Sequence, residues 1–139
     1  MPPSIRAIFL FLLASCGDHA THSAMDQNTL TNERVRTYEF LAAIASDDYF
    51  PDHLVDKGRG VLVELCQAIE REKPGDLEGL YTHTHRATEA FNALQVEFEA
   101  ADSELETVAR ENIGGDIAFI AEAYGYDADV EDLIAPREW

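Results

Sequence analysis

The stretch LEGLYTHTHRATEAFNALQVEFEAADSELE, residues 77–106, decides the fold. Apolar and small side chains recur along it at steps of three and four, which places them on one face of an α-helix. They are Leu77, Leu80, Tyr81, Thr84, Ala87, Thr88, Phe91, Leu94 and Phe98. The stretch therefore predicts a long helix from residue 77 to about residue 100 with one buried face, followed by the start of another helix.

The same period continues on both sides of this central helix. Residues 32–45, 52–72 and 105–113 each carry an apolar stripe at helical spacing. Pro51 and the turn at 73–76 separate the first three segments, because proline and glycine interrupt helices. A chain of 139 residues is long enough to bury one core without disulfides or metal. We predict an all-α, single-domain helical bundle of four longer helices plus short helices.

Single residues in these segments predict local contacts. Gly58 lies on the apolar side of helix 52–72. A glycine inside a helix costs about 1 kcal/mol relative to alanine, so we expect another element to approach closely there. Cys66 lies on the same side and should behave as a small hydrophobic residue. Asp76 should cap the central helix.

Two features beyond residue 100 predict helix boundaries. Ser103 and Glu106 have the spacing of a capping box, in which each side chain accepts a hydrogen bond from the other residue's backbone N–H. The Gly-Gly pair at 114–115 predicts a break, with Asp116 capping a separate helix. In an uninterrupted helix, Asn112 and Asp116 would both point into the apolar stripe, where unpaired polar groups cost several kcal/mol.

The composition excludes several classes of function. Ten Lys and Arg residues stand against 27 Asp and Glu, and the formal net charge of −17 would repel nucleic acids and anionic lipids. Such a surface suits a basic partner, or serves solubility alone. The settings of Cys16 and Cys66 do not predict a disulfide. The sequence has no Cys/His ligand spacing, Gly-rich phosphate loop or G-x-S-x-G elbow, so we expect no metal, no cofactor and no catalytic residue.

Residues 1–24 have the organisation of a secretory signal. A single positive charge at Arg6 precedes an apolar run, which ends in Leu-Ala-Ser-Cys at residues 13–16. The run is shorter than the roughly 20 apolar residues that span a bilayer as a helix. Its ending resembles a bacterial lipobox, in which the cysteine, here Cys16, receives a lipid and becomes the mature N-terminus.

The position of the start codon decides between two locations. If translation starts at Met1, we expect a bacterial membrane-anchored lipoprotein, with residues 25–31 completing a tether and residues 32–139 forming the domain. If translation starts at Met25, the segment before it is not part of the protein, and the domain is cytoplasmic.

Five segments together give the chain a family likeness. In this combination they resemble the bacterial domain of unknown function 5713 family over residues 32–139. The segments are YFPDHLVDKG at 49–58, LYTHTHRATEAFNAL at 80–94, SELET at 103–107, AYGYDAD at 123–129 and IAPREW at 134–139. The resemblance implies a compact all-helical domain that begins near Met25, and it supplies no catalytic residue.

A polar line on the central helix is the candidate site. Tyr81, His85, Glu89 and Asn92 follow one another by about one helical turn, along one edge of the apolar stripe. They offer a phenol, an imidazole, a carboxylate and an amide to a small ligand or ion. A cation would need a further carboxylate, for which Glu106 is nearest in sequence. The alternative is that His85 and Glu89 only stabilise the helix, by about 0.2 to 0.5 kcal/mol.

We predict a non-enzymatic binding or interaction module. Its partner would be a protein, basic if charge drives the contact, and it would touch a membrane only through a lipid on Cys16. The rival is a small enzyme, or a metal- or ligand-binding protein, that uses the edge formed by His85, Glu89 and Asn92. A concave pocket at this edge would favour the rival, and a packed edge would favour the module.

Overall fold

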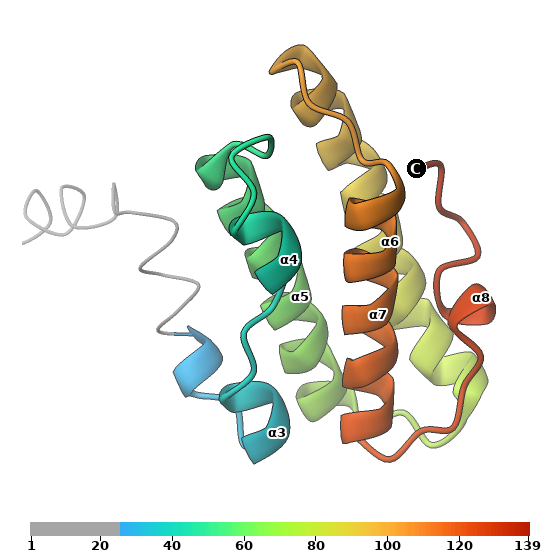
Figure 1. Ribbon diagram of the computed structural model, residues 1–139. Coiled ribbons are helices and arrows are strands. Elements are labelled where there is room, and N and C mark those ends of the chain that lie inside the picture. Colours follow the sequence, from blue (N-terminus) through green and yellow to red (C-terminus); the bar gives the residue numbers. More distant parts are fainter. Residues whose placement is uncertain (1–25) are drawn as a thin grey trace, which may run out of the picture.

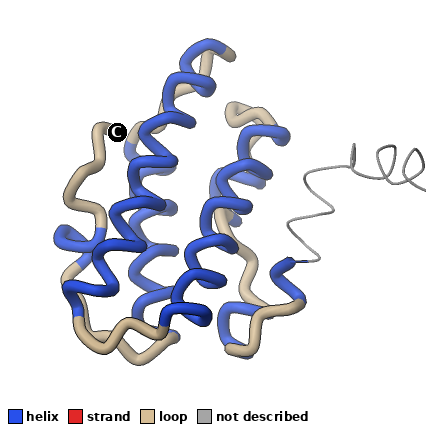
Figure 2. The backbone as a smooth tube through the Cα atoms, turned by 180° about the vertical axis from the view of Figure 1, so that it is seen from behind, coloured by secondary structure: helices blue, strands red, loops and turns tan. Residues whose placement is uncertain are grey.

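The computed structural model describes residues 26–139, and these residues contain helices and loops but no strand (Figure 2). Three helices are long: α5 (Asp52–Glu72), α6 (Leu77–Ala100) and α7 (Thr107–Ala123). Three more are single turns, α3 (Glu33–Arg36), α4 (Ala42–Ala45) and α8 (Val130–Leu133), and residues 26–28 are also helical. The predicted all-α fold is confirmed. The predicted leader and Cys16 lie outside the described residues.

The helix pair α5 and α6 is the largest packed unit of the fold. The two helices run side by side, joined by the turn at 73–76, and α7 runs along the length of the bundle with α4 on one side and α8 on the other (Figure 1). Asp76 caps α6 as predicted, its Oδ1 accepting a hydrogen bond from the N–H of Gly79 at 2.8 Å. None of the helices in residues 26–139 combines the length and apolar character needed to cross a membrane.

The predicted apolar face of α6 is buried, with Phe91 near its middle. Phe91 contacts the ring of Trp139 edge to face, with 6.3 Å between the ring centroids. On the other side it meets Gly58 of α5. A Cβ atom on Gly58 would lie 3.1 Å from Phe91 Cε1 and 2.8 Å from Leu41 Cδ1, closer than packed carbon atoms sit. The close approach predicted at Gly58 is confirmed.

The prediction of one long helix over residues 32–45 is wrong. The segment forms two single turns, α3 and α4, and between them Leu41 adopts the left-handed conformation at φ 57° and ψ 34°. The ring of Tyr38 stacks on Phe119 of α7, with centroids 4.1 Å apart. The apolar residues do recur at helical spacing. In a continuous helix, however, the N–H groups of Leu41 and Ile44 would donate to carbonyl groups of the same helix. In this fold, both groups donate to α7.

The predicted break at 114–115 is also wrong, because α7 runs through both glycines. Asn112 and Asp116 do point inward, as the sequence argument required, but neither is unpaired. Asp116 accepts from Leu41 N at 2.7 Å and from the Tyr38 hydroxyl at 3.0 Å. Asn112 Oδ1 accepts from Ile44 N at 3.1 Å. The two side chains therefore cap α4 from a neighbouring helix, which offsets the cost of their burial.

The capping box predicted at Ser103 and Glu106 does not form. The N–H of Ser103 instead donates to the carbonyl oxygen of Phe98 at 2.9 Å, and Asp102 adopts a left-handed φ of 61°. This Schellman arrangement ends α6 and uses the backbone group that the box required. The Ser103 hydroxyl is buried without a hydrogen-bond partner among the described residues. The next helix starts only at Thr107, without a side-chain cap.

Replacement of the buried Asp116 should separate its hydrogen bonding from its charge. Asp116→Ala should lower the free energy of unfolding by about 1 to 3 kcal/mol, because Leu41 N–H and the Tyr38 hydroxyl lose their acceptor. Asp116→Asn should cost less, since its amide oxygen still accepts a hydrogen bond. Burial raises the pKa of the Asp116 carboxyl against the two hydrogen bonds that lower it, so ionisation works against folding here.

Urea unfolding followed by circular dichroism measures these differences. The difference in the free energy of unfolding between wild type and Asp116→Asn should narrow as the pH rises through the raised pKa of Asp116. Only the wild type has a carboxyl at this position, so only the wild type loses stability there as the pH rises. Asp127→Ala is the control, since Asp127 is exposed and should matter by less than about 0.5 kcal/mol. An Asp116→Ala protein as stable as wild type would contradict the capping role.

Candidate functional site

The predicted polar edge of α6 faces the C-terminal segment of the chain. The rings of Tyr81 and His85 stack in parallel, with centroids 5.6 Å apart and 6° between their planes. His85 Nε2 lies 2.7 Å from the carbonyl oxygen of Asp132 in α8, so it donates a hydrogen bond to that oxygen. The imidazole of His85 therefore helps to hold α8 against α6.

Asn92 binds the tail that follows α8. Its Nδ2 donates to the carbonyl oxygen of Pro136 at 3.0 Å, and its Oδ1 accepts from the N–H of Glu138 at 2.8 Å. This pair of bonds fixes the tail so that Trp139, only 5% exposed, packs on Phe91. The chain's own C-terminal segment occupies this part of the edge.

The other predicted members of the site are not drawn into this contact. Glu89 is exposed to solvent on α6. Glu106 shares a hydrogen bond with Glu104, and this bond and the repulsion between the two carboxylates raise the pKa of Glu104. Within residues 26–139, no three His, Cys, Asp or Glu side chains form a group that could hold a metal ion. Ligand binding by Tyr81, His85, Glu89 and Asn92 stays a prediction.

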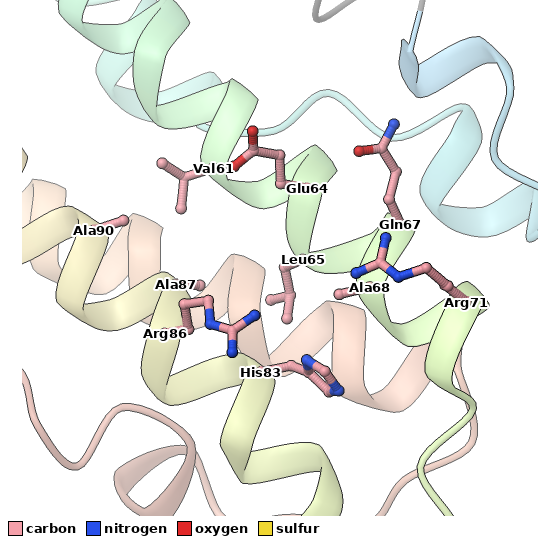
Figure 3. Close-up of a pocket in the computed structure, with 10 residues that line it drawn as sticks. All are labelled: Val61, Glu64, Leu65, Gln67, Ala68, Arg71, His83, Arg86, Ala87 and Ala90. Atoms are coloured by element: carbon pink, nitrogen blue, oxygen red, sulfur yellow. The ribbon is translucent and has the colours of Figure 1, made fainter.

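A groove between α5 and α6 is lined by apolar, basic, acidic and imidazole side chains. It encloses about 310 Å³ (Figure 3). Leu65 and Ala68 from α5 and Ala87 and Ala90 from α6 line it. Alanine side chains are short, so the two helices leave space between them here where longer side chains would close it. The floor of the groove is therefore apolar.

Polar and basic side chains stand along the groove. Arg71 extends from α5 and Arg86 from α6, and they point toward one another over the floor, with His83 beside them (Figure 3). Glu64 also lines the groove, and Arg71 Nε is 3.1 Å from Glu72. Arg86 makes no ion pair with any described residue. Two guanidinium groups thus converge on one hollow of a chain whose net charge is −17.

The histidine in this groove has an unused polar atom. His83 Nδ1 is buried and has no hydrogen-bond partner within the described residues. His83, Arg71 and Arg86 also line a second hollow, which opens toward Gly79 and Thr82. Buried polar atoms are normally paired, so this imidazole nitrogen beside a hollow is a candidate contact for a ligand atom or a water molecule.

This groove was not predicted from the sequence, because His83 was considered only together with His85. Residues two apart on a helix diverge by about 200°, which excluded a shared metal and led no further. In the structure, His85 faces α8 while His83 faces α5. The available signal was the coincidence of small residues on both helices, Ala68 and Ala90 among them, with arginines one helical turn away.

Cys66 lies in a buried cluster of a different character. It is fully buried, and burial together with the nearby charge of Glu70 raises the pKa of the thiol to about 12. A thiol with a raised pKa is a poor nucleophile, because the thiolate is the reactive form. The prediction that Cys66 acts as a small hydrophobic residue agrees with its place in the core.

Glu70 beside Cys66 joins three parts of the chain. Its carboxylate accepts from the Tyr124 hydroxyl at 2.6 Å, from Thr31 N at 3.0 Å and from Asn32 N at 3.1 Å. Burial opposes ionisation, but these donors outweigh it and lower the pKa of Glu70. The carboxylate thus ties the segment before α3 to α5 and to the end of α7, which is a structural role.

Fold and site together define a small all-helical domain, and the described residues form a mixed apolar and basic groove between α5 and α6. The chain belongs to the family of unknown function DUF5713, which matches residues 34–139. This confirms the resemblance drawn from the sequence segments. No curated protein and no solved structure was found to match the chain.

Replacement of Glu70 should change stability in a pH-dependent way. Glu70→Gln should lower the free energy of unfolding at pH 7 by about 1 kcal/mol, because a charged acceptor of three hydrogen bonds becomes neutral. Because the pKa of Glu70 is lowered in the folded protein, its carboxylate stabilises the fold at every pH above the ordinary carboxyl pKa. This stabilisation is lost as the pH falls through the lowered pKa. The difference between the two proteins should therefore vanish in acid.

Urea unfolding at a series of pH values tests this expectation. The control is Glu72→Gln, because Glu72 is exposed on the same helix and pairs only with Arg71. Exposed pairs of this kind contribute little, so its effect should be small at every pH. A Glu70→Gln effect that stays constant down to acid pH would show that the charge of Glu70 is irrelevant.

Proposed function

We propose that this protein is a non-enzymatic binding module whose contact surface is the groove between α5 and α6. One observation carries the proposal. Arg71, Arg86 and the unpaired Nδ1 of His83 converge on an apolar floor, in a chain that is otherwise strongly acidic. Binding sites commonly combine an apolar lining with a few convergent polar groups, and the volume of about 310 Å³ lies at the small end of their usual range.

Two further features support binding over the enzymatic rival. In the polar edge formed by His85, Glu89 and Asn92, His85 contacts α8 and Asn92 contacts the tail, so the edge is packed at those two positions. The one described cysteine, Cys66, is buried with a raised thiol pKa. His85 and Asn92 are thus engaged within the chain, Cys66 is not an accessible nucleophile, and of this set only the Glu89 carboxylate is exposed.

The groove is distinct from the other contacts expected of this protein. The acidic surface still predicts a basic protein partner, and a lipid on Cys16 still predicts a membrane anchor. Both expectations concern parts of the protein other than Arg71, Arg86 and His83. The groove supports the proposal because it combines two arginines and a histidine with an apolar floor.

Fragment screening by NMR tests the proposal. Fragments that bind should shift the backbone amide signals of residues 61–71 and 83–90, on the two walls of the groove. Ala90→Phe should fill the groove and weaken these fragments at least tenfold. Ala93→Phe is the matched control, because Ala93 is exposed on the same helix and does not line the groove.

The proposal fails if fragments bind Ala90→Phe as well as they bind wild type. It also fails if the shifted amides gather elsewhere, for example along the edge at Tyr81 and Asn92. That second pattern would favour the edge predicted from the sequence.

A further inference from the structure

We propose that the ligand of the α5–α6 groove is a small organic monocarboxylate with an apolar body. Its carboxylate would lie between the guanidinium groups of Arg71 and Arg86, next to the imidazole of His83, and its apolar body along the alanine-lined floor (Figure 3). This inference rests on the proposed binding function and adds the chemical class of the ligand.

The head group follows from the donors that line the groove. A guanidinium is planar and presents several N–H donors in a fork that matches the two oxygens of a carboxylate. Arg86 is free to act in this way because it forms no ion pair with a described residue. Arg71 already has Glu72 at 3.1 Å, but that pair is exposed and exchanges readily. His83 Nδ1 supplies one further unpaired position for a ligand oxygen.

The choice of one negative charge over two follows from the surroundings. Glu64 lines the same groove, and Glu72 stands beside Arg71. The whole chain carries a formal charge of −17, which repels a dianion more strongly than a monoanion. A carboxylate therefore suits this site better than a phosphate, although both fit a guanidinium.

The apolar body follows from the floor of the groove. Leu65, Ala68 and Ala87 are each less than 10% exposed yet line the hollow, and they offer no hydrogen bond to a polar ligand. A short hydrocarbon chain would remove this apolar surface from water. A ligand that was polar throughout would lose its hydration there without replacement.

NMR titration of the purified full chain with hexanoate tests the inference, and hexanamide serves as a neutral ligand of the same shape. Hexanoate should shift the amides of the groove, and hexanamide should bind there at least tenfold more weakly. Hexyl phosphate, a dianion near neutral pH, should also bind more weakly than hexanoate. Arg86→Gln and Arg71→Gln should each weaken hexanoate at least fivefold. Arg110→Gln, which removes an exposed arginine on α7, should leave its affinity unchanged.

The possible failures are distinguishable. If hexanoate and hexanamide bind the groove equally, or Arg86→Gln binds hexanoate like Arg110→Gln, the carboxylate assignment is overturned while the groove remains a binding site. Tighter binding of hexyl phosphate would overturn the choice of a monoanion. If neither these probes nor any fragment shifts the groove amides, the proposed function fails together with the ligand assignment.

Discussion

The hydrogen bond from the backbone N–H of Leu41 to the buried carboxylate of Asp116 is the constraint on which the rest of the structure depends. Asp116 is only 2% exposed, so its carboxylate needs hydrogen-bond donors inside the protein. The start of α4 supplies such a donor, so Asp116 can lie within an unbroken α7. Leu41 adopts a left-handed conformation in doing so and brings its side chain against Gly58. Gly58 in turn lets Phe91 of α6 approach, and Trp139 closes over Phe91. One buried carboxylate thus connects α4, α7, α5, α6 and the tail.

The groove lies outside this chain of contacts. In Figure 3, α7 is seen behind α5 and α6, so the hollow opens on the side of the helix pair away from α7. On the covered side, the helices carry large apolar side chains such as Phe91 and Leu62, and on the open side they carry Ala68 and Ala90. The same two helices therefore build the core with one face and leave a shallow, partly basic site on the other.

The periodic spacing of apolar residues correctly predicted those helices whose bounds are set by residues near one another in the sequence. The bounds of α5 and α6, the close contact at Gly58 and the cap at Asp76 all follow from residues near one another in the sequence. The division of residues 32–45 and the continuity of α7 did not follow, because Asp116 finds its partner 75 positions earlier in the chain. A sequence argument that counts only local hydrogen bonds treats such a residue as unpaired and places a helix end there.

The candidate site shows the same limit. The polar line through His85 and Asn92 was predicted to bind a ligand, but these two side chains bind α8 and the tail of the same chain, 44 to 47 residues further on. The groove at His83 required knowing which face of α6 meets α5, which spacing within one helix does not reveal. Because the whole chain is strongly acidic, its composition also gave no indication that two arginines line one groove.

Residue-resolved hydrogen exchange of the amides in α4 tests most directly whether α7 caps this turn. The amides of Leu41 and Ile44 should exchange only through global unfolding, with a free energy of opening equal to that from urea unfolding. The amide of Ala43, exposed in the same turn and without an acceptor among the described residues, should exchange far faster. Exchange of Leu41 and Ile44 as fast as that of Ala43 would contradict the account, because the carboxylate of Asp116 would then not hold this turn in place.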